Sequence, residues 1–310
     1  MRPPIKNERG QAIVLTVIAL TMVLGMAALA VDVGSWFRED RRAQATADAA
    51  ALAGAQVLAF NGTGAARALA LDYADRNGGG VEEDDVTFES QLGPGDTIVV
   101  QAKRTTPGFF AKIFGIDSVD VHAKAKARVA VPSSARYVAP IAVNRFHPML
   151  SCEPPPCTDL TEIELADLHK PGGGDAAGDF SLLDLRQGGD GTVGESEAAD
   201  WMTDGYDELM PLGIYDAIPS AMFNGDQFQD ALASVLGKEI LLPVYLPPVV
   251  RSGSTADFNI VAWVGFVPTQ VVGRGAAARI RGHFTTFIAQ GVQGSGGSED
   301  LGVRTIQLVE

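Results

Sequence analysis

The chain has 310 residues and a formal net charge of -14, with 35 glycines and 17 prolines. This length suits one large domain or two ordinary ones, and the glycine and proline content predicts many turns. The acidic balance excludes nucleic acid as a partner, because phosphate binding needs a concentrated basic surface.

The first predicted element is a membrane span at residues 12–31, a stretch without charge or proline. At about 1.5 Å per residue, a helix of this length crosses a hydrocarbon core of roughly 30 Å. Two alternatives are a buried helix of a soluble protein and a secretory signal with a small-x-small site at Ala28-Leu29-Ala30. The length of the stretch and the helical sequence beyond it favour a retained anchor.

Basic residues lie on both sides of the span, so the positive-inside count is nearly balanced. Long domains translocate largely regardless of their charge. We therefore expect a single-pass protein of the cytoplasmic membrane, with its N-terminus inside and its C-terminal bulk outside the cytoplasm. The small residues predicted to let another helix approach closely are Gly25, Ala27, Ala28 and Gly34.

Residues 41–59 are rich in alanine, the best helix former, and Asn61-Gly62 suits a helix stop. Residues 1–60 are therefore predicted to hold a cytoplasmic tip, the transmembrane helix and an alanine-rich extension, in one rod of about 70 Å. The extension either packs laterally against copies or partner proteins, or packs on the globular part of its own chain. Both arrangements can coexist.

Three segments around the span carry a family resemblance: Glu8–Gln11, Val31–Gly34 and Arg41–Ala55. They resemble the N-terminal region of TadE/TadG-like proteins of tight-adherence (Flp-type) pilus assembly, over about residues 8–60. A looser likeness extends to Val131 through Phe109–Gly115 and Val119–Ala123. The resemblance implies a non-enzymatic protein of this secretion system that contacts pilin or other assembly subunits.

Two departures from family patterns refine this expectation. Pilin-type precursors carry a glutamate five residues after the cleaved glycine, whereas Leu15 stands five residues after Gly10. A retained TadG-like anchor therefore fits better than a processed pilin subunit. Some members carry a von Willebrand A domain with an Asp-x-Ser-x-Ser metal motif, but Asp179–Leu183 lacks the second serine, so we do not assign that domain.

A small pilin-like α+β domain is predicted over residues 61–132. Its expected helices are Ala65–Arg76 and Gly108–Phe114, and its expected strands are Val86–Glu89, Thr97–Lys103 and Val119–Val129. The last strand is the clearest, because apolar residues alternate with polar, mostly basic ones over eleven positions.

A second domain, mixed α+β or mainly β, is predicted over residues 137–310, so the fold class of the whole chain is α+β. Its expected strands are Val138–Val143, Phe180–Leu185, Ile240–Leu246, Asp257–Val272, Arg279–Ile288 and Val303–Val309. Its expected helices are Glu195–Thr203 and Asp226–Leu236, and Gly291–Ser298 has the composition of a flexible linker.

The two cysteines, Cys152 and Cys157, suit a small disulfide loop in an oxidising compartment, with two free thiols as the alternative. Four aspartates near glycines could offer oxygen ligands to calcium, although such clusters are usually turns: Asp175, Asp179, Asp184 and Asp190. No other motif assembles a catalytic group, and we predict no catalytic residue, no cofactor and no metal site.

The leading hypothesis is a membrane-anchored, non-enzymatic component of Flp-type pilus assembly that contacts the fibre or its machinery outside the cytoplasm. The second is a signal-anchored extracytoplasmic protein that binds a ligand or the cell wall through residues 137–310. The third is a tethered hydrolase.

Overall fold

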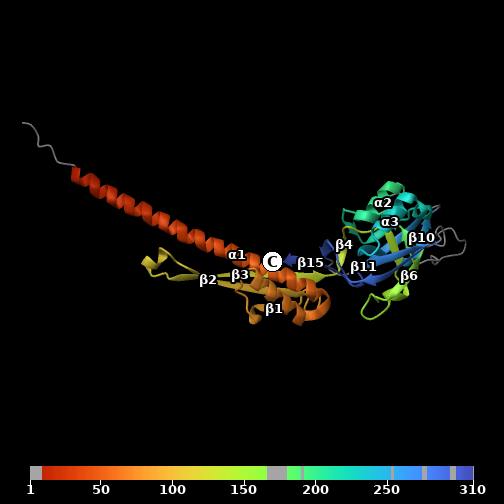
Figure 1. Cartoon of the computed structure of the whole chain (residues 1–310), viewed down its shortest axis with the longest axis horizontal. Coiled ribbons are helices and arrows are strands. Elements are labelled where there is room, and N and C mark those ends of the chain that lie inside the picture. Colours follow the sequence, from red (N-terminus) through yellow and green to blue (C-terminus); the bar gives the residue numbers. More distant parts are fainter. Residues whose placement is uncertain are drawn as a thin grey trace, which may run out of the picture.

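The computed structural model describes residues 9–165, 180–189, 192–252, 255–273, 278–293 and 298–309. A long helix, α1 (Arg9–Arg76), projects from one end of an elongated molecule, and a mixed α/β region with three β-sheets follows it (Figure 1). This arrangement confirms the predicted α+β class with a long N-terminal apolar helix.

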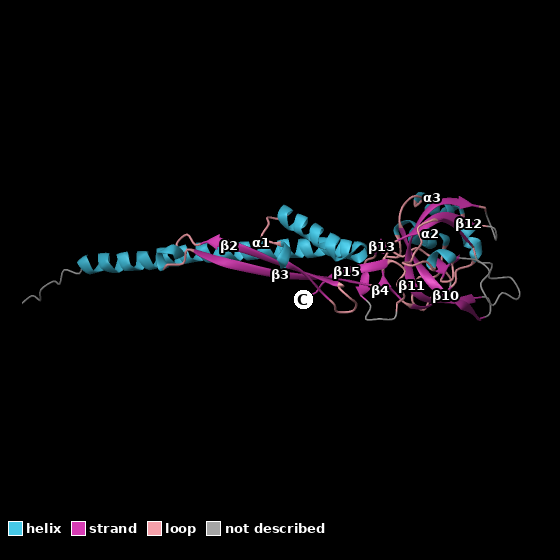
Figure 2. Cartoon of the chain, turned by 90° about the horizontal axis from the view of Figure 1, so that it is seen from below, coloured by secondary structure: helices cyan, strands magenta, loops and turns pink. Residues whose placement is uncertain are grey.

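Helix α1 folds back on itself at Gly62, whose backbone is non-helical with φ 78° and ψ 178°. Residues 9–61 form the first arm, and residues 63–76 form a second arm that turns back along it (Figure 2). A Cβ atom added to Gly54 would lie 3.1 Å from the Ala66 carbonyl oxygen and 3.2 Å from the Ala70 Cβ. The two arms therefore touch through small side chains. The predicted break at Asn61-Gly62 and the helix after it are confirmed.

The first sheet is antiparallel over four strands and has the order β1-β2-β3-β15-β13, with β13 parallel to β15. Its strands are β1 (Val86–Glu89), β2 (Thr97–Pro107), β3 (Ser118–Ala130), β13 (Phe287–Ile288) and β15 (Val303–Val309). Short 3-10 turns lie at Glu83–Asp85 and Ala111–Phe114, so the expected helix over 108–114 is shorter and more tightly wound.

The predicted alternation of β3 is confirmed. Val121, Ala123, Ala125, Ala127 and Val129 are buried and belong to one core with the alanines of α1. The polar residues between them point to the other face of the sheet, since successive side chains alternate along a strand.

The C-terminal strand β15 pairs with β3, in a register that sets Thr305 opposite Ala130. The sequence placed Val303–Val309 as a closing strand of the second region, and this placement is corrected. Alternating apolar residues mark a strand but do not say which sheet it joins. The chain therefore leaves the first sheet after β3 and returns to it with β13 and β15 (Figure 1).

The second region is built on a larger sheet of order β6-β12-β11-β10-β5-β7, with β9 also paired to β11. Its strands are β5 (Ile141–Asn144), β6 (Leu160–Glu164), β7 (Phe180–Leu182), β9 (Gly213–Asp216), β10 (Ile240–Ser252), β11 (Thr255–Val272) and β12 (Arg279–Thr285). Helices α2 (Glu195–Asp204) and α3 (Asp226–Ser234) confirm the two predicted helices, and 3-10 turns lie at Pro148–Leu150 and Ser220–Asn224.

A small third sheet, of order β14-β4-β8, lies between these two units (Figure 1). Its strands are β4 (Pro132–Ala135), β8 (Met210–Pro211) and β14 (Gly291–Gln293). The expected linker at Gly291–Ser298 thus begins as a strand, while residues 294–297 lie outside the described chain. Gly291 pairs with Ala135 of β4, so this residue belongs to a sheet although the glycine-rich composition of the segment predicted a linker.

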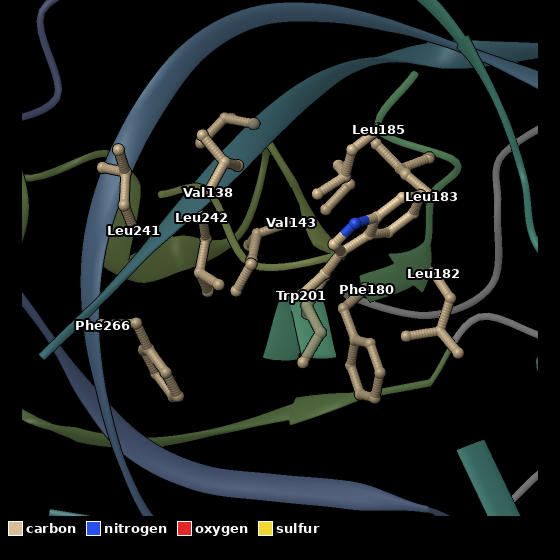
Figure 3. Packing of buried hydrophobic residues seen from close by; sticks show 14 of the residues in the cluster. Val138, Val143, Phe180, Leu182, Leu183, Leu185, Trp201, Leu241, Leu242 and Phe266 are labelled. Carbon is tan, nitrogen blue, oxygen red and sulfur yellow. The ribbon is translucent and has the colours of Figure 1, made fainter. Parts of the chain in front are cut away.

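The core of the second region is rich in large side chains. Trp201 of α2 packs close to Leu183 and Leu185, and Phe180 of β7 lies beside them (Figure 3). Trp263 on β11 is 1% exposed and Phe284 on β12 is fully buried. Burial of such aromatic area is the main stabilising contribution in a unit of this size.

Candidate functional site: the apolar helix and its junction with the sheet

The candidate span at residues 12–31 makes almost no contact with the rest of the chain. Its large apolar side chains are exposed, from 48% for Ile18 to 67% for Ile13, and no residue of its most apolar window is buried. The hydroxyls of Thr16 and Thr21 donate to the carbonyls of Ala12 and Val17, both at 2.8 Å. The helix therefore satisfies its own polar groups and presents only apolar surface, as a lipid environment requires.

Burial begins sharply at Asp32, the residue that follows the span and the first charge after it. Its side chain is fully buried. The carboxylate accepts backbone N–H bonds from Phe109 at 3.0 Å, Phe110 at 2.9 Å and Ala111 at 2.5 Å. These three donors open the 3-10 turn between β2 and β3, and a carboxylate is the natural cap for such free N–H groups.

A second polar junction lies about two to four turns further along α1. Arg104 of β2 donates to the Thr46 hydroxyl at 2.9 Å and to the Asn77 carbonyl at 3.1 Å, and lies 3.6 Å from Glu39. Thr46 itself donates to the Asn77 carbonyl at 2.8 Å. One guanidinium thus joins the first arm, the end of the second arm and the sheet.

The alanine-rich extension packs on the protein's own sheet. Its buried face consists of fully buried small residues: Ala43, Ala47, Ala50, Ala51 and Ala55. They share one core with Ile98 and Val100 of β2. The second of the two predicted arrangements therefore accounts for this face, and only the other faces of the extension remain for a partner.

Of the four predicted helix-packing residues, the chain leaves three uncovered and partly covers the fourth. A Cβ added to Gly25 or Gly34 would meet nothing within 4 Å. Ala27 is exposed, and Ala28 is partly buried. Within the chain these residues make no close helix contact, so their predicted role depends on a second molecule.

The cysteine loop lies at the start of the second region, where Cys152 and Cys157 form a disulfide with their Cα atoms 5.7 Å apart. The neighbouring His147 is 4% exposed, and its Nδ1 accepts the Met149 backbone N–H at 3.2 Å. Its ring packs edge-on against Phe284 at 5.3 Å between centroids. His147 is thus a core residue with its Nδ1 engaged.

The aspartates considered for calcium do not assemble a visible site. Asp175, Asp179 and Asp190 lie outside the described residues. Asp184 is fully buried, and the Arg186 guanidinium donates to both of its oxygens at 2.9 and 2.8 Å. No group of three or more metal-ligating side chains occurs within the described part of the chain.

A cleft of about 490 Å³ opens where the α1 bend meets the β1–β2 turn and the start of β15. Burial raises the pKa of Asp96 at its edge, but N–H donors from Gln91, Leu92 and Gly93 outweigh burial and hold that pKa below its usual value. The acidic groups here are stabilised as anions, which does not suit a general acid or base.

The opposite edge of the cleft has the same character. Burial raises the pKa of Asp300, but hydrogen bonds from the Arg304 guanidinium and the Gly302 N–H hold it below its usual value. Arg304 is thereby engaged in an ion pair. The charged groups of Asp96, Asp300 and Arg304 at the cleft are therefore already engaged in hydrogen bonds or an ion pair within the protein.

These features define a protein whose described residues include one candidate membrane-spanning helix, with a large folded region on its C-terminal side. Residues 10–57 match the family model described as Flp pilus-assembly, TadE/G-like. The chain therefore contains a TadE/G-like domain over this stretch, which confirms the resemblance seen in the sequence. No curated protein and no solved structure matches the chain.

Sequence reasoning missed the role of Asp32. The residue was noted only as part of the segment Val31–Gly34, because its partners lie 77 to 79 residues away along the chain. The only local signal is an acidic residue placed directly after an apolar span, and that signal does not identify a partner.

Proposed function

We propose that this protein is a membrane-anchored, non-enzymatic component of tight-adherence (Flp-type) pilus assembly. Residues 12–31 cross the cytoplasmic membrane, with the N-terminus inside and the folded bulk outside. The outer regions contact pilin subunits or other assembly proteins. The observation that carries this proposal is the family match over residues 10–57, which spans most of the exposed apolar helix and the arm packed on the sheet.

The outward orientation has two physical supports. The cysteine pair suits an oxidising compartment. The first arm of α1 leaves the span directly into a folded region of more than two hundred residues, and such domains translocate regardless of their charge.

The non-enzymatic character has its support in the polar groups of the described residues. Asp184 pairs with Arg186, and Asp300 pairs with Arg304. The carboxylate of Glu195 accepts the backbone N–H of Gln227 at 2.9 Å, at the start of α3. Each of these groups has a structural partner, and they do not converge on one open pocket as a catalytic site would.

A deletion of the gene in its native host tests the function. We expect loss of surface pili by electron microscopy and of surface adherence, both restored by the full chain. Normal piliation in the deletion strain would contradict the proposal.

A chain with Ser90→Cys, labelled in intact spheroplasts by a membrane-impermeant maleimide, tests the orientation, because Ser90 lies exposed beside the β1–β2 turn. The matched site is Lys6→Cys, expected to react only after lysis.

The helix-packing residues are proposed to face another membrane helix. Gly25→Ile adds a side chain where the chain itself offers no obstacle. We expect the variant to fold and reach the membrane but to lose co-purification with pilus-assembly proteins in mild detergent. Val23→Ile is the matched control, since Val23 is exposed and already β-branched. Equal co-purification of both variants would contradict a packing role for Gly25.

The second candidate is an extracytoplasmic binding protein. It is favoured by the separate aromatic core of the second region, which gives that unit the build of an independent module. The full chain in detergent would then bind peptidoglycan fragments, a glycan or calcium in calorimetry, and the deletion strain would keep its pili. Absence of binding together with loss of pili would exclude this candidate.

A further inference from the structure

The loop between β2 and β3, here called the hairpin tip (residues 108–117), exposes an unusual amount of apolar surface. Five large apolar side chains in eight residues are exposed by 44 to 80%: Phe109, Phe110, Ile113, Phe114 and Ile116. Elsewhere in the described chain, apart from the span, such exposed side chains occur singly or in pairs. A concentrated apolar patch of this kind marks an interaction surface.

The position of the hairpin tip relative to the span is fixed by Asp32. Its carboxylate binds the backbone N–H groups of Phe109, Phe110 and Ala111, so the tip lies beside the helix at the residue where the span ends. Ala28, one helical turn earlier on the same face, is the only partly buried residue of 12–31. Figures 1 and 2 show β2 and β3 running along α1 towards its N-terminal end.

We propose that the hairpin tip inserts into the outer interface of the lipid bilayer, as a second membrane contact beside the transmembrane helix. When residues 12–31 fill a hydrocarbon core of roughly 30 Å, Val31 and Asp32 lie at its boundary. The hairpin tip must then lie at the same depth, because it is bonded to Asp32. Its phenylalanine and isoleucine side chains meet the acyl boundary, where aromatic residues gather and amphipathic segments insert by about 5–10 Å.

The polar groups of the hairpin tip are suited to this depth. The carboxylate of Asp32 and three of the backbone N–H groups satisfy one another, so neither carries an open hydrogen-bonding group into lipid. The turn satisfies further donors internally, since the N–H groups of Gly115 and Ile116 bond to the carbonyls of Lys112 and Ala111.

Besides the exposed Asp117, the hairpin tip and its surroundings carry basic side chains that can bind lipid headgroups. Lys112 lies exposed within the apolar cluster, and Arg38 and Arg41 lie exposed on α1 beyond the span. Basic side chains with long apolar stems reach up to headgroup phosphates while their neighbours lie deeper. Phe37, which is 64% exposed, adds another aromatic ring just past the boundary.

This inference rests on the proposed membrane anchor, and the experiment separates the two. The full chain carrying Ile113→Cys is labelled with a nitroxide and reconstituted in vesicles of phosphatidylcholine with some phosphatidylglycerol. The paired native cysteines take up no label, which the unsubstituted chain verifies. Spin relaxation by oxygen, which partitions into lipid, and by a water-soluble nickel chelate reports the depth of the label.

We expect the label at residue 113 to be relaxed by oxygen and about tenfold less by the nickel chelate than a label at Ser90→Cys, because it lies below the headgroups. A label at Met22→Cys reports the anchor independently. Equal relaxation by the nickel chelate at residues 113 and 90 would overturn the proposal. If the label at residue 22 is still relaxed by oxygen in that case, the proposed membrane anchor is not contradicted. Protection at residue 113 that disappears on diluting the protein in lipid would instead assign the surface to a second copy.

A second variant tests the role of Asp32 as a positioning residue. Asp32→Ala removes the acceptor for three N–H groups of the hairpin tip. We expect the label at residue 113 to become more accessible to the nickel chelate while the label at residue 22 is unchanged. An unchanged label at residue 113 in a folded Asp32→Ala chain would contradict this role.

Discussion

The two hydrophobic cores of this protein are built on opposite principles. The core between α1 and the first sheet consists mainly of alanine and valine and contains no buried aromatic side chain among the described residues. The core of the second region contains Trp263, Tyr245 and six phenylalanines, all buried. Both are closely packed, but one brings backbones together and the other fills the space between them with large side chains.

This difference predicts opposite sensitivities to mutation. A core of alanines has little to lose when a side chain is shortened, but its helix and sheet lie so close that added atoms collide. A core of aromatic residues tolerates small shape changes but loses much stability when a ring is removed. Local hydrogen exchange in the detergent-solubilised full chain can follow each core separately.

The largest expected effect is the loss of an aromatic ring from the second core. Trp263→Ala removes an indole that is 1% exposed and should lower the stability of this unit by about 3–5 kcal/mol. Exchange protection should fall in β10, β11 and β12 and persist in β3. Trp263→Phe, which keeps most of the buried area, is the control with a smaller loss. Equal protection in both variants would contradict a volume-filled core.

The next largest effect is overpacking of the alanine core. Gly54→Val adds atoms next to the side chain of Ile98 and 3.1 Å from the Ala66 carbonyl, and should cost about 1–3 kcal/mol. The loss of protection should lie in α1, β2 and β3. Gly64→Val is matched in helix and residue type but meets nothing within 4 Å, so it should leave β2 and β3 protected. Equal loss of exchange protection in β2 and β3 for both variants would contradict the close packing of the helix at Gly54.

A smaller, pH-dependent contribution belongs to the edge of the first core. Three N–H donors hold the pKa of Asp96 below its usual value despite its burial. A carboxyl with a lowered folded-state pKa stabilises the fold above its unfolded pKa of about 3.9, and this stability is lost as the pH falls through the folded value. Asp96→Asn should therefore cost about 1 kcal/mol at neutral pH, a difference that shrinks below about pH 4.

Urea unfolding at several pH values measures this difference between the parent chain and Asp96→Asn. Asp40→Asn serves as the control, since Asp40 is exposed on α1. If the difference in unfolding free energy between the parent chain and Asp96→Asn stays constant down to the lowest pH, the carboxylate charge contributes nothing to stability.

The smallest expected effect is that of an ion pair on the second region. Arg145 donates to both carboxylate oxygens of Glu299, which lowers the pKa of Glu299. The Glu299 side chain is 43% exposed and that of Arg145 is 19% exposed, so solvent still screens the pair. Glu299→Gln should therefore lower the unfolding free energy by about 0.5 kcal/mol, and by less at high salt. The thermal midpoint in low and high salt measures it, with Glu153→Gln as the exposed control. A salt-independent loss would point to packing instead.

Local sequence signals predicted most elements of this fold. The uncharged stretch at residues 12–31, the break at Asn61-Gly62 and the alternation in Val119–Val129 all depend on neighbours along the chain. The prediction failed where the cause lies far away. Short strands such as β4 and β14 are defined by pairing with distant segments in the third sheet, and their own residues have no strand pattern.

The junction at Asp32 could not be predicted for the same reason. An aspartate after an apolar span is compatible with a simple exit into solvent. Its burial arises because β2 and β3 bring a turn with free N–H groups to that level of the helix. The sequence showed the apolar hairpin tip as a short helix near Phe110 but gave no reason to place it beside the span.

The return of β15 to the first sheet has a mechanical consequence. The second region is attached through two neighbouring strands, β3 and β15, rather than through one flexible tether. Tension between that region and the helix at the opposite end would be directed along the strands. The eleven paired positions of β2 and β3, from Thr97 opposite Arg128 to Pro107 opposite Ser118, would then be loaded together in shear. A ladder loaded in this way opens only when many hydrogen bonds fail at once, so this connection can transmit pulling force without unravelling one bond at a time.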